Sequence, residues 1–249
     1  MRIRWGARVL GTLALLSVLC GCEQSFLLAH FAEPSEDCAL VAEGASALER
    51  GVLDLAFRDG YTATAVLKNI VANPVADGPA SVRVEGTNVR IWPGGRKEGE
   101  PIYQFSAPAT GYVSEGETRP LPLLLLPRQA VDALVQARFD GRVLADLWLE
   151  DLIGYRELVT VGVSVLGTTF GGSAVETPEA FLSIDLCGGC LVECTEESRG
   201  DASASFDYCT SFEPVEDEPC RLGQDQLIDC RLGLPFYGEE VSRMLCERS

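Results

Sequence analysis

The stretch Cys187-Gly188-Gly189-Cys190 is the one motif in this sequence with a direct chemical interpretation. Two thiols at this spacing can cycle between a dithiol and a disulfide, and the two glycines leave the backbone free to close the small ring. In thioredoxin-like sites the first cysteine begins a helix that lowers its pKa, whereas Leu191-Val192-Glu193 is a poor start for a helix. We therefore expect a structural disulfide, with a redox-active dithiol as the alternative.

The same two cysteines, followed by Cys194, have a spacing that could also hold zinc or an iron–sulfur cluster. An exported protein with many cysteines usually oxidises them, and no histidine lies nearby in the sequence to complete a metal site. Metal binding through Cys187 and Cys190 is therefore a further alternative, and the sequence predicts no cofactor.

A second cysteine motif, Leu19-Cys20-Gly21-Cys22, ends a hydrophobic run that is preceded by Arg2, Arg4 and Arg8. The run, residues 9–19, suits the apolar region of a signal peptide and is too short for a spanning helix, which needs roughly 20 apolar residues. Gly21 supplies the small side chain that lipoprotein processing prefers before the cysteine. The sequence predicts a signal peptide over residues 1–21 and lipidation of Cys22.

The cysteine count agrees with this choice. The chain has ten cysteines, and removal of Cys20 with lipidation of Cys22 leaves eight, which can all pair. The eight disulfide candidates are Cys38, Cys187, Cys190, Cys194, Cys209, Cys220, Cys230 and Cys246. Seven of them lie in residues 187–249, so this segment cannot pair wholly within itself, and we expect Cys38 to bridge to it.

Residues for catalysis are hard to find elsewhere. His30 is the single histidine, and it lies in the segment expected to tether the protein to the membrane, so the commonest general base is missing from the body of the chain. The acidic clusters at 150–151 and 213–218 are typical of solvated surfaces rather than of two carboxylates facing each other across a cleft. We expect no catalytic residues.

The net charge of the chain argues against some classes of binding partner. All 37 acidic residues follow Cys22, as do 17 of the 20 basic ones, so the mature chain carries a net charge of −20 (17 − 37). Such a chain is repelled by nucleic acid and by anionic lipid surfaces. A hydrophobic content of 47% nevertheless supports a folded core.

The pattern along residues 51–186 predicts strands. Alternating apolar residues at 159–165 indicate a half-buried strand, and the apolar run at 121–126 indicates a fully buried one. Further strands are expected at 52–57, 61–68, 82–91, 102–105, 112–113 and 180–186, and a helix is expected at 128–137. The apolar residues of 143–152 fit both the period of a helix and the period of a strand, so this stretch is left open. Such spacing predicts a mainly β fold, an immunoglobulin-like β-sandwich with one or two short helices.

The segments outside this body have other compositions. Residues 22–50 are expected to be the lipid tether leading into the domain. Residues 187–249 contain few long apolar runs and many cysteines, so we expect a small disulfide-rich C-terminal subdomain packed on the sandwich.

Two stretches carry a resemblance to a known group of proteins. One runs from Gly167-Thr168-Thr169 through Val175-Glu176-Thr177 to Ile184–Leu191, and the other is Cys220 with Gly223-Gln224-Asp225 and Cys230. Together with the lipidation motif they resemble uncharacterised cysteine-rich lipoproteins of myxobacteria-type Gram-negative bacteria. The resemblance implies an anchor, a β-rich body and a cysteine-rich tail, and no catalytic residues.

These observations predict an outer-membrane lipoprotein that faces the periplasm or the cell surface. Its expected role is non-catalytic, either structural or in binding a protein partner of the envelope. The alternative is an envelope thiol oxidoreductase or metal-binding protein that uses Cys187 and Cys190.

Overall fold

The computed structural model describes residues 26–33, 40, 42, 44, 46–71, 77–97, 99–193, 220–221 and 223–229. The predicted signal peptide and several predicted cysteine sites, namely Cys22, Cys38, Cys194, Cys209, Cys230 and Cys246, lie outside these residues. Among the helices in the described ranges, none combines the length and the apolar character needed to cross a membrane.

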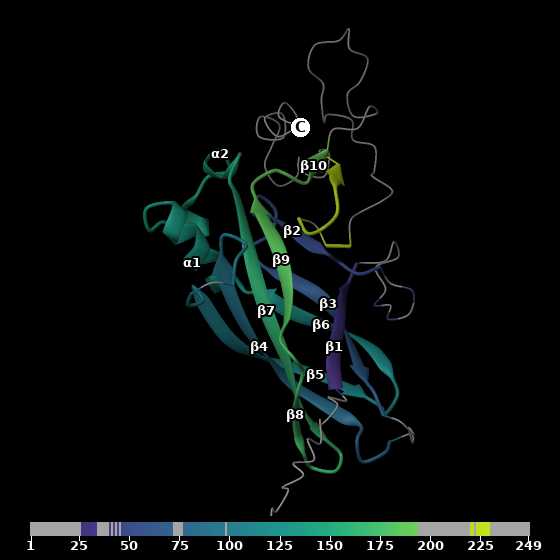
Figure 1. Cartoon of the computed structure of the whole chain (residues 1–249). Helices are drawn as coiled ribbons and strands as arrows, with labels where there is room; N and C mark the ends of the chain where they lie inside the picture. Colours follow the sequence, from purple (N-terminus) through teal and green to yellow (C-terminus); the bar gives the residue numbers. More distant parts are fainter. Residues whose placement is uncertain are drawn as a thin grey trace, which may run out of the picture.

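The fold is mainly β, as predicted, and is built from two principal sheets (Figure 1). The smaller sheet has the antiparallel order β1–β3–β6, with strands Phe26–Ala32, Tyr61–Asn69 and Thr118–Leu126. The larger sheet has the order β2–β9–β7–β4–β5, with strands Arg50–Asp54, Ala180–Cys187, Arg156–Thr169, Val82–Pro93 and Tyr103–Val113. The short strand β8, Ala174–Glu176, pairs with β7.

The inward faces of both sheets meet in one hydrophobic core. Val161, Val163 and Ile184 of the larger sheet and Leu67 and Leu125 of the smaller one belong to this core, and none of the five is exposed. Successive side chains of a strand point to opposite faces, so the alternating apolar residues all lie on the inward face.

The central strand β7 departs from its prediction. Residues 159–165 were expected to be half-buried, but all seven are buried. The outward face is covered by the end of β8 and the segment after it: Glu176 of β8 accepts a hydrogen bond from the Ser164 hydroxyl (2.6 Å), and Glu179 forms an ion pair with Arg90. A central strand with neighbours on both sides and side chains over it loses its solvent face.

The apolar run at 121–126 is the opposite case. It forms part of β6, but Leu124 is 41% exposed, so the prediction of a fully buried strand is wrong. β6 lies at an edge of the smaller sheet and covers the core with one face. The prolines Pro120 and Pro122 suit an edge strand, where a missing N–H costs no ladder hydrogen bond.

The sandwich also begins earlier than residue 51. β1 lies within the segment predicted to be tether, and it pairs with β3 along most of its length. Phe26 and Phe31 of β1 are buried, so the apolar character of this segment contributes directly to the core. The strands predicted separately at 102–105 and 112–113 are one continuous strand, β5.

Within the described residues, helical structure is confined to the connection between β6 and β7. The predicted helix is confirmed as α1, Arg128–Arg138, and its Val131, Leu134 and Val135 are buried as expected. The stretch 143–152, which fitted both periods, contains the 3-10 helix η1, Leu144–Asp146, and the single helical turn α2, Leu149–Leu152.

The described part of the C-terminal segment packs on one end of the sandwich. Strand β10, Val192–Glu193, pairs in parallel with β11, Ile228–Asp229. Residues 223–225 lie against β2: the Asp54 N–H donates to the Gly223 carbonyl (2.8 Å) and Leu53 bridges to Gln224. The segment is therefore attached to the body through backbone contacts.

Candidate functional site

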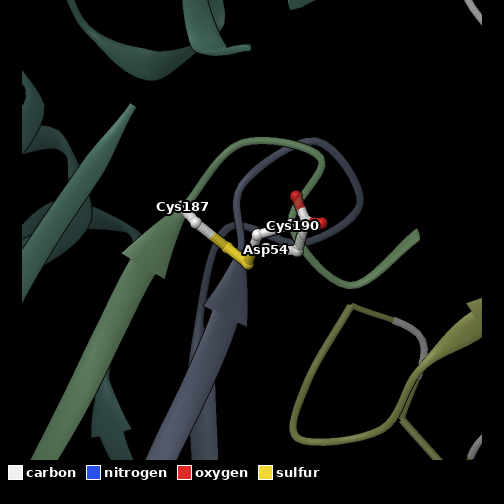
Figure 2. A group of neighbouring side chains, drawn as sticks. All are labelled: Asp54, Cys187 and Cys190. Atoms are coloured by element: carbon white, nitrogen blue, oxygen red, sulfur yellow. A yellow bond between two sulfur atoms is a disulfide. The ribbon is translucent and has the colours of Figure 1, made fainter. Parts of the chain in front are cut away.

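The candidate site lies at the ends of two parallel strands. Asp54 is the last residue of β2 and Cys187 is the last residue of β9, and the parallel register places them side by side. Cys190 returns to the same point after the two-glycine turn, as Figure 2 shows. We call Asp54, Cys187 and Cys190 the disulfide clamp.

Cys187 and Cys190 form a disulfide with each other, as the sequence predicted. Their Cα atoms are 5.9 Å apart, within the usual range for a bridged pair. Cys220 is also disulfide-bonded. With Cys187 paired to Cys190, five candidates remain in the tail, which is still an odd number, so the predicted bridge from Cys38 stays a prediction.

The Asp54 carboxylate is buried and accepts hydrogen bonds from the backbone around it. Its Oδ1 atom accepts from the N–H groups of Ala56 (3.0 Å) and Gly189 (2.7 Å), and its Oδ2 atom accepts from the N–H of Leu191 (3.0 Å). Two of these donors belong to the turn that carries the disulfide. The carboxylate thus fixes this turn against the end of β2.

The electrostatics of Asp54 are set by burial. Desolvation raises the pKa of this carboxyl, and the N–H groups of Leu191, Gly189, Ala56 and Cys190 partly offset that rise by stabilising the charged form. No part of the residue is exposed. Because its oxygens are already engaged, Asp54 has little capacity left to act as a base.

The two glycines of the motif have structural reasons to be glycine. A Cβ atom at Gly188 would overlap the carbonyl oxygen of Leu152, and Gly189 has a φ of +74°, in the left-handed region. The Gly188 N–H also donates to the Tyr155 carbonyl (3.2 Å). The turn therefore needs these residues for its path, whatever the redox state of the cysteines.

We expect Gly188→Ala to lower the free energy of unfolding by about 3 kcal/mol, because the obstructing atom is backbone and cannot rotate away. Gly172→Ala is the matched control: its Cβ would meet nothing within 4 Å and its φ is +87°, so only a backbone cost of about 1 kcal/mol remains. Urea denaturation measures both. Equal losses would show that close packing at Gly188 is unimportant.

A second acid, which is half-buried, holds the C-terminal segment. Asp225 accepts hydrogen bonds from the Tyr61 hydroxyl (2.7 and 2.8 Å) and from the Val52 N–H (2.7 Å). Burial is the largest cause of the raised pKa of both the Asp225 carboxyl and the Tyr61 phenol. Gln224 adds a two-way hydrogen bond to the backbone of Thr62. Residues 223–225 thereby join β2 and β3.

The chemistry available to the disulfide clamp depends on the state of its sulfurs. The carboxylate and sulfur atoms of the three residues lie within 4.8 Å of one another, which would suit a soft metal if the disulfide were reduced. In the disulfide form both sulfurs are bonded to each other, and a metal would have to displace backbone N–H groups from Asp54. The arrangement favours a clamp over a metal site.

The structure thus brings Cys187 and Cys190 together and adds Asp54, which the sequence did not single out. The Gly223-Gln224-Asp225 stretch appeared only as part of a resemblance, without a role. Asp54 is buried and Asp225 is half-buried because segments far apart in the sequence meet around them. His30 lies in β1, in the smaller sheet, so it is not part of the clamp.

Comparisons with known proteins leave the chain without a family. No protein-family model matches the sequence, and no curated protein is similar to it. A solved structure of AT1g01470 from Arabidopsis thaliana aligns at 11% identity over 59% of this chain and 89% of that one, with a TM-score of 0.32. Spo0M, the sporulation control protein from Bacillus subtilis, aligns at 11% identity over 55% and 50%, with a TM-score of 0.21. Neither likeness is strong enough to support a function.

Proposed function

We propose that this protein is a lipid-anchored envelope protein with a non-catalytic role, structural or in binding a protein partner. The observation that carries the non-catalytic part is the engagement of Asp54. Its two oxygens accept three backbone hydrogen bonds and brace the turn that carries the Cys187–Cys190 disulfide. A group so occupied stabilises a fold and has no free atom to offer a substrate.

The anchor and its location rest on the sequence. The basic start, the apolar run and Gly21-Cys22 support export and lipidation at Cys22, in the outer membrane of a Gram-negative cell. An exported compartment is oxidising, which agrees with the disulfide at Cys187. The resemblance to cysteine-rich lipoproteins of myxobacteria-type bacteria belongs to the same proposal.

We infer an immunoglobulin-like topology for the sandwich. Strands β3, β4, β6, β7 and β9 would correspond to immunoglobulin strands B, C, E, F and G. The smaller sheet would then be the A–B–E sheet and the larger one the G–F–C sheet, with β5 next to the C strand. Sandwiches of this architecture are common in proteins that present surfaces to partners, which supports an interaction role without naming the partner.

The second candidate is a thiol oxidoreductase or metal-binding protein. The specific observation in its favour is the convergence of the three potential ligand atoms of the disulfide clamp. It requires that the disulfide open easily in the native protein. Burial of Cys187, which is 1% exposed, and the backbone hydrogen bonds around the turn oppose access by a reductant.

Thiol titration distinguishes these two functions. We expect the native, purified protein to show no free thiol and to keep its Cys187–Cys190 disulfide in mild reductant, because the bridge is buried and braced. Full reduction in denaturant should then release the eight thiols of the mature chain. The measurement is an Ellman assay, with bound metal determined on the same sample.

The double variant Cys187→Ser/Cys190→Ser is the control that shows whether any reactive thiols belong to these two cysteines. A native pair that is reduced readily, and that disappears in the double variant, would overturn the structural role and favour the oxidoreductase. Bound metal that is lost in the same variant would favour the metal-binding protein.

A further inference from the structure

We propose that the end of the sandwich opposite the disulfide clamp lies on the lipid surface, with Ile70 and Phe170 in contact with it. This inference rests on the proposed lipidation of Cys22. It goes further by assigning which surface of the protein meets the bilayer and which surface is held away from it.

Only a short length of chain joins the proposed anchor to the fold. Phe26 is the fourth residue after Cys22, and a fully extended chain covers at most about 3.6 Å per residue, or about 14 Å in total. Phe26 is buried and pairs with Asn69, so it is a fixed point of the sandwich. The lipid must therefore lie close to this end.

Several turns share that end of the sandwich. Asn69 donates a side-chain hydrogen bond to the Ala80 carbonyl (2.9 Å), and its N–H donates to the Glu117 carbonyl (3.1 Å). The Phe170 N–H donates to the Ser81 carbonyl (2.9 Å). The turns at 77–81, 114–117 and 170–173 therefore gather around the start of β1. In Figure 1 the β8 hairpin and the start of β1 lie at the bottom, and β10 lies at the top.

Exposed apolar side chains also lie at this end. Ile70, directly after β3, is 48% exposed, and Phe170, at the tip of the β7–β8 hairpin, is 54% exposed. The Phe170 ring stacks on Tyr112 with 5.1 Å between centroids, which holds it in place. Single exposed apolar residues are ordinary on a protein surface. Two of them beside a short lipid tether would lose water at the bilayer interface at no extra ordering cost.

Charged side chains of both signs lie at this end. Glu115 accepts from the Ala80 N–H (2.7 Å), Glu117 accepts from the Ser114 N–H (2.8 Å), and Asp77 accepts from the Tyr112 hydroxyl. Lys68 lies opposite Thr118, and Arg119 donates to the Tyr112 carbonyl (2.8 Å). A zwitterionic surface, which also carries charges of both signs, suits such an end.

The orientation determines which surface of the protein faces away from the membrane. β7 runs from Arg156, opposite Cys187, to Thr169, opposite Val82. Its 14 residues at about 3.3 Å each hold the disulfide clamp about 45 Å from the membrane end. The exposed Trp148 and the segment 223–229 lie toward the far end, where a protein partner would meet them.

Quenching by brominated lipid tests this orientation. After removal of the signal peptide, the tryptophans are Trp92 and Trp148, and both lie toward the clamp end. The lipidated full-length variant Phe170→Trp is reconstituted into vesicles of phosphatidylcholine with brominated acyl chains. We expect the introduced tryptophan to lose about half of its fluorescence, since interfacial side chains reach about 5–10 Å into the boundary.

The unsubstituted protein is the control, and its emission should stay unchanged in the same vesicles. Ile70→Trp provides a second reporter if Phe170→Trp folds poorly. A protein that does not float with vesicles overturns the anchor and this orientation together. A protein that floats, but whose introduced tryptophans are not quenched, overturns the orientation and leaves the anchor intact.

Discussion

Cys22→Ser is expected to release the protein from the membrane fraction, and Cys20→Ser is expected to leave it there. Lipoprotein processing would attach two or more acyl chains at Cys22, and each buried methylene contributes about 0.8 kcal/mol to membrane binding. A single chain anchors only marginally, so the loss of all of them should lower partition into detergent or vesicles by at least about 100-fold.

Phase separation in Triton X-114, together with the mass of the N-terminal peptide, measures this effect. Cys20 is a well-matched control because it lies two residues before Cys22 and has the same chemistry, but it would be removed with the signal peptide. Release of the Cys20→Ser variant, or retention of the Cys22→Ser variant in the membrane, would contradict the assignment of the anchor.

Asp54→Ala is expected to lower the free energy of unfolding by about 4 kcal/mol. Two buried backbone N–H groups and one part-buried one lose their acceptor, and each unsatisfied donor costs about 1–3 kcal/mol. Relief of the desolvation of Asp54 recovers part of this loss. Urea denaturation with the disulfide intact measures the change.

Asp185→Ala is the matched control. Asp185 lies on β9 two residues before Cys187, and its ion pair with Arg50 is at the surface. Exposed ion pairs contribute only about 0–1 kcal/mol, so this variant should stay within about 1 kcal/mol of the unsubstituted protein. A loss of similar size in both variants would show that Asp54 does not brace the clamp.

The effect of Asp54 should also depend on pH. Burial raises the pKa of this carboxyl in the folded protein above its value in the unfolded chain. The folded state therefore takes up the proton first, so the stability from this group is complete below the unfolded pKa, near pH 4, and is lost as pH rises through the folded pKa. The difference between the unsubstituted protein and Asp54→Ala should widen as pH falls from 7 toward 4.

Local patterns in the sequence were sufficient for much of the fold. Alternating residues located most strands, and the spacing of Val131, Leu134 and Val135 located α1. The disulfide was predictable too, because Cys187 and Cys190 are three residues apart and need only a tight turn to meet. These features depend on contacts between near neighbours, which the order of residues specifies directly.

The errors in predicted burial arise because the sequence pattern does not give the position of a strand within its sheet. Alternation tells which side chains share a face, but not whether a strand is central or at an edge. β7 has partners on both sides and a covered outer face, whereas β6 has an edge and leaves Leu124 exposed. The number of neighbours depends on strand order, which involves residues far apart in the sequence.

Residue order alone was enough to predict an anchor motif, to count the excess of acids and to identify the cysteines that could pair. The environment of the motif at 187–190 depends instead on how distant strands come together. Asp54 reaches Cys187 because β2 pairs in parallel with β9, across more than half of the chain. Parallel pairing of distant strands leaves no local signal, so a carboxylate that braces the disulfide became visible only in the folded protein.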